Sequence, residues 1–170
     1  MAHRLPAHGA SPDRPPADLK ETHMVQPCFV ADREQVIDTM IALTRLSNLH
    51  RAIVAGAGSM ELYLSLRRRG FDRITMPATG PLPRRQHSIA LITGGISLST
   101  IEAALVQVSP FLSASAAIAI LIRSHEGALC LKIREKLEQM GFRIEAGVRC
   151  HEGLVLSAYR HGFAQLEQAA

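Results

Sequence analysis

The stretch that decides the fold of this 170-residue chain is Arg51-Ala-Ile-Val-Ala-Gly-Ala-Gly-Ser-Met-Glu-Leu-Tyr-Leu-Ser-Leu-Arg-Arg-Arg-Gly70. Its apolar start, residues 52–55, predicts a short strand, and the two glycines that follow predict a tight turn. Residues 60–69 then form an expected helix, capped by Ser59 and ended by Gly70. Such a unit can hold the phosphate or adenosyl part of a nucleotide, because glycine lets the backbone approach and the first helical N–H groups point at the ligand.

Composition narrows the class of protein. Hydrophobic residues make up 47% and charged residues 20%, which suits a single globular domain. Aromatic residues are only 4% and tryptophan is absent, so the expected core is aliphatic, with helices packed on a buried sheet. The net charge of +4 is mild and gives no indication of nucleic-acid binding. No apolar run reaches about 18 residues, so no membrane span is predicted.

Three cysteines and eight histidines are present, but their spacing matches no metal-ligand motif, so no metal is expected. An odd number of cysteines fits a reducing cytoplasm. The arginines at 67–69 suit the carboxyl-terminal end of a helix, whereas Arg84-Arg85 remains a candidate for phosphate contacts.

The chain divides into a proline-rich tail at residues 1–28, predicted to be disordered, a domain at residues 29–162, and a short carboxyl-terminal tail at residues 163–170. Asp32-Arg-Glu-Gln35 has the capping-box pattern and predicts a first helix that runs from Asp32 to about Leu46. A second capping box, Ser99-Thr-Ile-Glu102, predicts a helix whose apolar stripe extends to Leu112.

Apolar runs and turn residues place the other elements. Strands are expected at residues 73–76, 88–93, 116–122, 143–148 and 154–159, a loop at 77–86, and a helix at 127–140. Strands that alternate with helices indicate a mostly parallel sheet. The expected fold is an α/β, three-layer Rossmann-like sandwich that closes with an antiparallel hairpin around His151-Glu-Gly153.

This order resembles the class I S-adenosylmethionine-dependent methyltransferases over about residues 50–160. The residues that carry the resemblance are the glycine loop Ala52-Ile-Val-Ala-Gly-Ala-Gly-Ser59, the strand Ser88-Ile-Ala-Leu-Ile-Thr93, the run from Ile101 to Leu112 that leads into Ala116–Ile122, and the run from Ile133 to Ile144. The resemblance implies S-adenosylmethionine as the cofactor. It would bind at the carboxyl ends of the strands, through Ala55, Gly56, Ala57, Gly58 and Ser59, with Gly94 and Gly95 opposite.

Several positions depart from the pattern of that family. Val54 stands where an acidic residue usually precedes the first glycine, and Met60 replaces a small residue, so its side chain would crowd a bound methionine group. The second strand ends in Met76-Pro77-Ala78, where the family has a carboxylate that grips both ribose hydroxyls. Residues 76–88 are too few for the family's third strand and its helix. Thr93-Gly94-Gly95 replaces the usual Asn- or Asp-Pro-Pro-aromatic motif.

Two hypotheses follow. The departures favour a non-catalytic descendant of the fold that acts as a regulatory or scaffold subunit. The alternative is a small S-adenosylmethionine-dependent methyltransferase of unknown substrate. A homodimer or a protein partner would use the sheet edge at Arg73–Met76, which a missing strand leaves open.

No catalytic residue is assigned. His87 and the pair His125-Glu126 are expected on the binding edge or the surface, and helix-start polarity explains the pair. Cys150-His151 resembles a nucleophile and its base, but neighbouring side chains in a strand or turn point apart. Cys130 is expected to be a small core residue.

Overall fold

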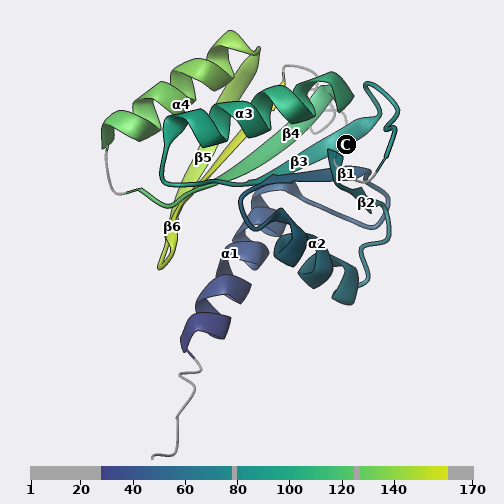
Figure 1. Ribbon diagram of the computed structural model, residues 1–170, viewed down its shortest axis with the longest axis horizontal. Helices are drawn as coiled ribbons and strands as arrows, with labels where there is room; N and C mark the ends of the chain where they lie inside the picture. Colours follow the sequence, from purple (N-terminus) through teal and green to yellow (C-terminus); the bar gives the residue numbers. More distant parts are fainter. Residues whose placement is uncertain (1–27, 78–79, 125–126, 161–170) are drawn as a thin grey trace, which may run out of the picture.

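A computed structural model of the chain describes residues 28–77, 80–124 and 127–160 (Figure 1). It has three layers, with a six-stranded sheet between two pairs of helices. The elements in chain order are α1 (Cys28–Thr44), β1 (Ala52–Gly56), α2 (Ser59–Arg68), β2 (Ile74–Thr75), β3 (His87–Thr93), α3 (Leu98–Val108), a 3₁₀ turn (Ser109–Phe111), β4 (Leu112–Ile122), α4 (Gly127–Gln139), β5 (Phe142–Cys150) and β6 (Gly153–Arg160).

The sheet confirms the predicted α/β sandwich. Its strand order is β2-β1-β3-β4-β6-β5; the first four strands are parallel, and β6 and β5 are antiparallel to their neighbours. The closing hairpin turns at His151 and Glu152, as the sequence predicts. The predicted tails lie almost wholly outside the described residues.

The core has two halves, one on each face of the sheet. Alternate residues of the buried strands point to opposite faces, because side chains in a strand have a period of two. Ile53 and Ala55 of β1 therefore pack with α3 and α4, whereas Ala52 and Val54 pack with α1 and α2. Both halves are built mainly from aliphatic side chains, as the composition predicts.

The helix starts differ from the predicted caps. Helix α1 begins at Cys28, before the capping-box pattern at Asp32. Ser59 is the first residue of α2 and not its cap; the cap is Gly58, which has a left-handed backbone and provides no side-chain hydrogen bond. In α3 the cap is Ser97, whose hydroxyl accepts a hydrogen bond from the Thr100 N–H at 3.4 Å, so the Ser99 capping box is wrong.

The end of α3 also corrects the sequence analysis. Leu112 is the first residue of β4 and not part of the helical stripe, because α3 stops at Val108 and the Pro110 segment forms a 3₁₀ turn. Proline has no N–H to continue the α-helical ladder, which explains this early stop. Strand β4 consequently has 11 residues, longer than the expected run from Ala116 to Ile122.

Helix α2 ends at Arg68 with Arg69 as its cap, and Gly70 follows with a φ of 87°, the left-handed terminator that the sequence predicts. Two of the three arginines at this helix end are paired. Arg67 donates to the Asp72 carboxylate at 3.0 Å, and Arg69 forms ion pairs with Glu34 and Asp38 of α1. These ion pairs join the end of α2 to α1 and to the segment before β2, and the charged helix end matches the expectation.

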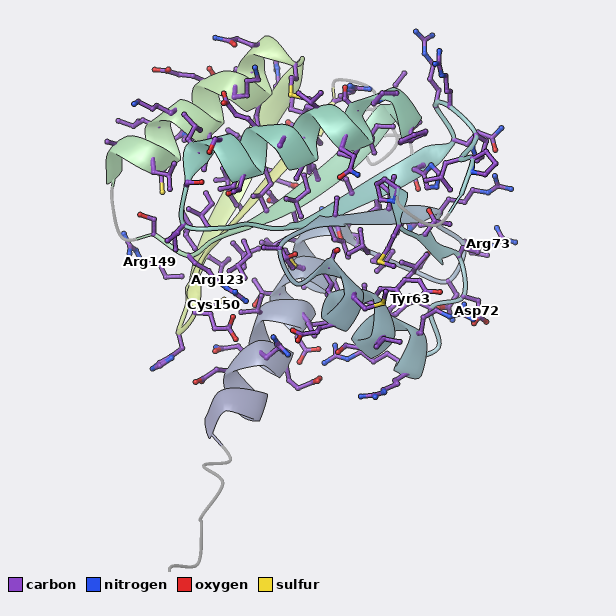
Figure 2. All side chains as sticks on the ribbon, viewed as in Figure 1. Tyr63, Asp72, Arg73, Arg123, Arg149 and Cys150 are labelled. Carbon is purple, nitrogen blue, oxygen red and sulfur yellow. The ribbon has the colours of Figure 1, made fainter. Side chains whose placement is uncertain are left out.

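The parallel strands give the sheet two unlike edges. The carboxyl edge is where β1, β3 and β4 end, and the amino edge is where they begin. Figure 2 shows Arg73 near the amino edge and Arg123, just after β4, near the carboxyl edge. The two-residue β2 is an outer strand of the sheet, so Arg73–Met76 does lie at a sheet edge.

Candidate functional site

The glycine turn after β1 is shaped first by strand packing. Gly56 pairs with Thr93 of β3, and a side-chain carbon at Gly56 would lie 2.2 Å from the Thr93 carbonyl oxygen. Its φ of 97° is also a conformation that side chains rarely adopt. Glycine is therefore needed at this position by the sheet itself, whatever the turn binds.

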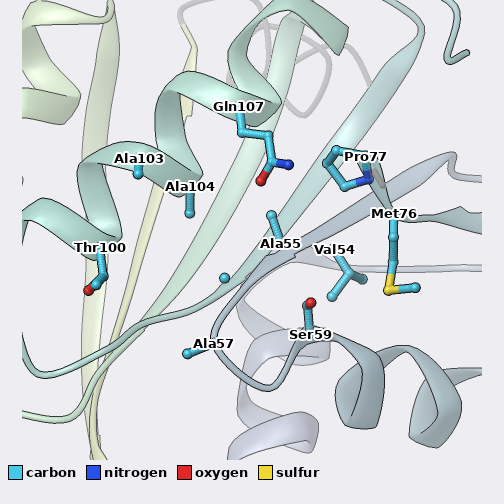
Figure 3. A pocket seen from close by; sticks show the side chains of 11 residues that line it. Val54, Ala55, Ala57, Ser59, Met76, Pro77, Thr100, Ala103, Ala104 and Gln107 are labelled. Atoms are coloured by element: carbon cyan, nitrogen blue, oxygen red, sulfur yellow. The ribbon is translucent and has the colours of Figure 1, made fainter. Parts of the chain in front are cut away.

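A pocket of about 470 Å³ opens beside this turn, between the ends of β1 and β2 and the side of α3 (Figure 3). This volume lies in the range of small-molecule sites. The pocket is at the carboxyl edge, where open α/β sheets bind ligands. The residues that line it are Val54, Ala55, Gly56, Ala57, Ser59, Met76, Pro77, Thr100, Ala103, Ala104 and Gln107.

None of the described lining residues carries an ionisable side chain. The polar side chains are the Ser59 hydroxyl, the Gln107 amide and the Thr100 hydroxyl (Figure 3). The Thr100 hydroxyl donates to the Ser97 carbonyl at 2.8 Å and is thus already engaged. Met76 and Pro77 form an apolar wall where β2 ends. The chemistry available here is hydrogen bonding and apolar contact.

The structure brings part of the predicted site together. Ala55, Gly56, Ala57 and Ser59 line the pocket, whereas Gly58 faces a different hollow. Met60 lies on the exposed side of α2 and is not a lining residue, so its expected crowding of the site does not occur in this pocket.

Gly94 and Gly95 do not line the pocket either. The Gly94 N–H donates to the Leu121 carbonyl at 2.8 Å, and a side-chain carbon at Gly94 would lie 2.0 Å from that oxygen. Gly95 lies against Thr100, whose hydroxyl oxygen would be 2.5 Å from an added carbon. Both glycines thus make room for neighbouring parts of the protein.

Helix α3 supplies lining residues that the sequence analysis missed. Thr100, Ala103, Ala104 and Gln107 recur at helical spacing, so they form one face of α3. The sequence did show this uncharged helix face beside the apolar stripe. Small and amide side chains, however, do not by themselves indicate a ligand-binding surface.

A second, much smaller hollow of about 50 Å³ lies on the other face of the carboxyl edge, against α1. Gly58 and Thr93 line it together with two ion pairs. Arg33 of α1 pairs with Glu61 of α2, and Arg123 pairs with Glu152 at 3.0 Å. The charged side chains that line this hollow are therefore matched with partners of opposite charge.

His87 is neither on the binding edge nor on the surface. It is 2% exposed and begins β3, so it lies at the amino edge. Its Nε2 is 2.9 Å from the Thr75 hydroxyl, and its Nδ1 is 3.3 Å from the Phe111 carbonyl oxygen. Burial, helped by the charge of Arg51, lowers its pKa below the ordinary 6.5 against the opposing effect of the Phe111 carbonyl. A neutral, structural imidazole results.

The other candidates also remain separate from the pocket. The Cys150 thiol is 3.6 Å from the Thr39 hydroxyl, whereas the His151 ring is 3.2 Å from the Asp32 carboxylate, so the two side chains do point apart. Cys130 is half-buried and packs against the core, as expected. His125-Glu126 lies outside the described residues. Within the described ranges, no three histidine, cysteine or acidic side chains gather as a metal site would require.

Comparison with known proteins identifies the fold. No protein-family model and no curated protein sequence matches the chain. Among solved structures it is similar to the precorrin-6y C5,15-methyltransferase of Geobacter metallireducens, with a TM-score of 0.54 and 17% identity over 74% of this chain and 89% of that one. Magnesium protoporphyrin IX methyltransferase of Synechocystis, solved with bound S-adenosylmethionine, gives a TM-score of 0.52 and 15% identity over 82% and 85%.

An S-adenosylmethionine-dependent O-methyltransferase of Thermotoga maritima gives a TM-score of 0.51 and 13% identity over 84% of this chain and 68% of that one. At these identities the likeness is one of fold. The chain has the Rossmann-like fold of the class I S-adenosylmethionine-dependent methyltransferases, as the sequence resemblance predicts. None of the helices in the described ranges is both long and apolar enough to cross a membrane.

Proposed function

We propose that this chain is a non-catalytic protein of methyltransferase-like fold that serves as a regulatory or scaffold subunit. The observation that carries the proposal is the uncharged lining of the pocket beside the glycine turn, as far as the residues are described. Met76 and Pro77 occupy the end of β2, where a bound nucleoside would need an acceptor for its two ribose hydroxyls. Polar ligand groups left without partners lose a few kcal/mol of binding.

The glycines support the same proposal from another direction. Gly56 and Gly94 would each bring an added side-chain carbon within about 2 Å of a backbone carbonyl oxygen. They are accounted for by packing, so their presence carries no requirement for a ligand.

The proposed partner surface is the sheet edge at Arg73–Met76. Here β2 pairs with β1 on one side and forms the outer edge of the sheet on the other. Unpaired backbone groups of an outer strand favour pairing with a second copy or with another protein. Arg73 is exposed and donates to the Leu49 carbonyl at 3.2 Å, and Leu49 itself is 80% exposed beside it.

We place this subunit in the cytoplasm, because Cys130 and Cys150 are free thiols.

The alternative is a small S-adenosylmethionine-dependent methyltransferase. It is favoured by the 470 Å³ volume of the pocket and by the Ser59 and Gln107 side chains that can hydrogen-bond a ligand. In that case Ala55, Gly56, Ala57 and Ser59 would contact the cofactor, with α3 in place of the expected Gly94 and Gly95.

Isothermal titration with S-adenosylmethionine and S-adenosylhomocysteine separates the two functions. We expect no heat of binding up to millimolar ligand, because the described lining has no carboxylate at the end of β2 to accept from the ribose hydroxyls. Micromolar binding would overturn the non-catalytic proposal and support the enzyme. In that event Gln107→Leu should weaken binding, whereas Glu138→Gln, an exposed change on α4 away from the pocket, should leave it unchanged.

Gly58→Val is not a clean test of ligand binding. Gly58 has a φ of 79°, so any β-branched side chain would strain the turn whether or not a ligand binds there.

The partner proposal is tested by sedimentation of the full chain across a concentration series. A monomer at all concentrations would exclude the homodimer and leave a different protein as the partner.

A further inference from the structure

A hollow of about 400 Å³ lies at the amino edge of the sheet, at the opposite end from the glycine turn. Its described lining comes from the loop before β3, the start of β4, the residue before β5 and the end of β6. Those residues are Arg85, Leu112, Ala114, Gly141 and Arg160. Four segments that are far apart in the chain thus meet around two arginines.

The Arg160 side chain is held in place by groups around it. Its Nη1 lies 3.4 Å from the Leu112 carbonyl oxygen and 3.0 Å from the Ser113 carbonyl oxygen, and donates to both. Its guanidinium carbon lies 4.8 Å from the centre of the Phe142 ring, within cation–π range. The Nε and Nη2 donors make no hydrogen bond to any described residue. An oriented guanidinium with donors to spare among the described residues is the arrangement that recognises planar or tetrahedral oxyanions.

Arg85 is presented by a constrained backbone. It has a φ of 56°, uncommon for a residue with a side chain, and its N–H donates to the Pro110 carbonyl at 3.2 Å. This bond ties the loop before β3 to the 3₁₀ turn before β4. The backbone of Arg85 is fixed beside the hollow, while its side chain stays exposed.

Among the described residues, the two positive charges have no carboxylate partner. Neither Arg85 nor Arg160 forms an ion pair with a carboxylate of the described residues, whereas Arg33, Arg67 and Arg123 each pair with one and Arg69 pairs with two. Partial burial, with the charge of Arg85 as a second cause, lowers the pKa of Arg160. Like charges around one hollow repel each other, and a bound anion would relieve that repulsion.

We propose that the hollow between Arg85 and Arg160 binds an oxyanion, the phosphate or carboxylate group of a small molecule. Arg160 supplies oriented donors, Arg85 an exposed second charge, and Leu112 and Ala114 an apolar wall for the rest of the ligand. The site is independent of the pocket beside the glycine turn, so it stands whether or not that pocket binds S-adenosylmethionine.

The test is a titration of the ¹⁵N-labelled full chain with inorganic phosphate, followed by amide chemical shifts at low ionic strength. Sodium acetate forms a second arm, and sodium chloride of equal ionic strength is the control. We expect saturable shifts at the amides of Arg85, Ala114 and Gly141 with phosphate or acetate but not with chloride. Tighter phosphate binding identifies a phosphate ligand, and tighter acetate binding a carboxylate.

Matched variants make the result specific. Arg85→Ala should weaken the binding by about tenfold, because it removes one of two charges from the site. Arg84→Ala removes an equal charge from the neighbouring exposed residue outside the lining and should change affinity by less than about twofold. Arg160→Lys keeps the charge but loses the planar fork and should weaken binding by about fivefold or more.

Equal losses in Arg84→Ala and Arg85→Ala would overturn the proposal, since the anion would then respond only to general surface charge. Absence of saturable binding, or equal shifts with chloride, would overturn it too. Unfolding curves of each variant show that it is folded. If Arg160→Lys does not fold, the comparison of Arg84→Ala with Arg85→Ala still decides the matter.

Discussion

The two edges of the sheet differ in the charged side chains that line their hollows. At the carboxyl edge Arg33 pairs with Glu61 and Arg123 pairs with Glu152, and the pocket beside the glycine turn has an uncharged described lining. At the amino edge Arg85 and Arg160 share a hollow with no carboxylate partner in the described chain. The fold points to the carboxyl edge as the ligand site, whereas the hollow that is lined by two arginines lies at the amino edge. Fold and electrostatics therefore indicate different sites.

The largest expected effect tests whether the glycine turn is a packing feature. Gly56→Ala places a carbon 2.2 Å from the Thr93 carbonyl oxygen, so β1 and β3 must separate. We expect a loss of about 3 kcal/mol or more in the free energy of unfolding, measured by urea denaturation.

Gly70→Ala is the control for Gly56→Ala. Gly70 also has a positive φ, but no atom lies within 4 Å of an added carbon. Its substitution should lower the free energy of unfolding by about 1 kcal/mol, because only the positive φ is unfavourable for alanine. Equal losses for the two variants would contradict the packing explanation and return the first glycine to a ligand-binding role.

The next effect concerns the buried imidazole of the amino edge. Folding lowers the pKa of His87, chiefly through burial, so the unfolded chain takes up a proton first as the pH falls. The free energy of unfolding should be undiminished above the ordinary pKa of 6.5 and should decline below it, until the pH reaches the lowered pKa of the folded state.

Urea denaturation between pH 8 and pH 5 measures this decline, and His87→Gln provides the comparison. The variant should lose about 1–2 kcal/mol at pH 8 by disturbing the bonds to Thr75 and Phe111. Its stability should then vary less with pH than that of the parent chain. An unchanged slope would mean that another group is responsible.

A smaller effect is expected at the start of α3, the helix that lines the carboxyl-edge pocket. Ser97→Ala removes the hydroxyl that accepts from the Thr100 N–H and should cost about 1 kcal/mol. Ser99→Ala, two residues on, should change stability by less than about 0.5 kcal/mol. Thermal denaturation of the pair distinguishes the observed cap from the one predicted by the sequence; the reverse ranking would restore Ser99.

The smallest effects compare single arginines at the two edges. Arg123→Ala breaks a half-exposed ion pair with Glu152 and should cost less than about 1 kcal/mol, and less still at high salt. Arg85→Ala removes a repulsive charge and should leave stability unchanged or slightly increased. Melting temperatures at low and high salt measure both. A clear loss in Arg85→Ala would show that its charge has a partner.

The sequence predicted the strands along the chain, the mostly parallel sheet and the layers, because these depend on long apolar runs. Residues 89–92 of β3 and 116–122 of β4 are unbroken aliphatic runs, and they are buried because helices cover both faces of the sheet. Helix starts were predicted poorly, because several hydroxyl residues compete within a few positions, as Ser97, Ser99 and Thr100 do. Which one caps depends on the path of the preceding loop, and that path is a tertiary property.

The pocket could be predicted only in part for a related reason. The glycine turn was found because glycine is conspicuous, but Gln107 was not, since nothing local indicates that α3 lies against the end of β2. His87 was misplaced because its burial depends on Thr75 and Phe111, which come from two other segments. Arg160 drew no attention because its partners belong to β4 and β5.

The position of β6 has a consequence for how the protein is made. It is the last described strand in the chain, yet it lies inside the sheet, between β4 and β5. During synthesis, β5 and one side of β4 have no strand to pair with until residues 153–160, which form β6, have left the ribosome. The nascent chain thus exposes two strand edges that the finished protein never shows, and any assistance from chaperones should be needed most at that stage.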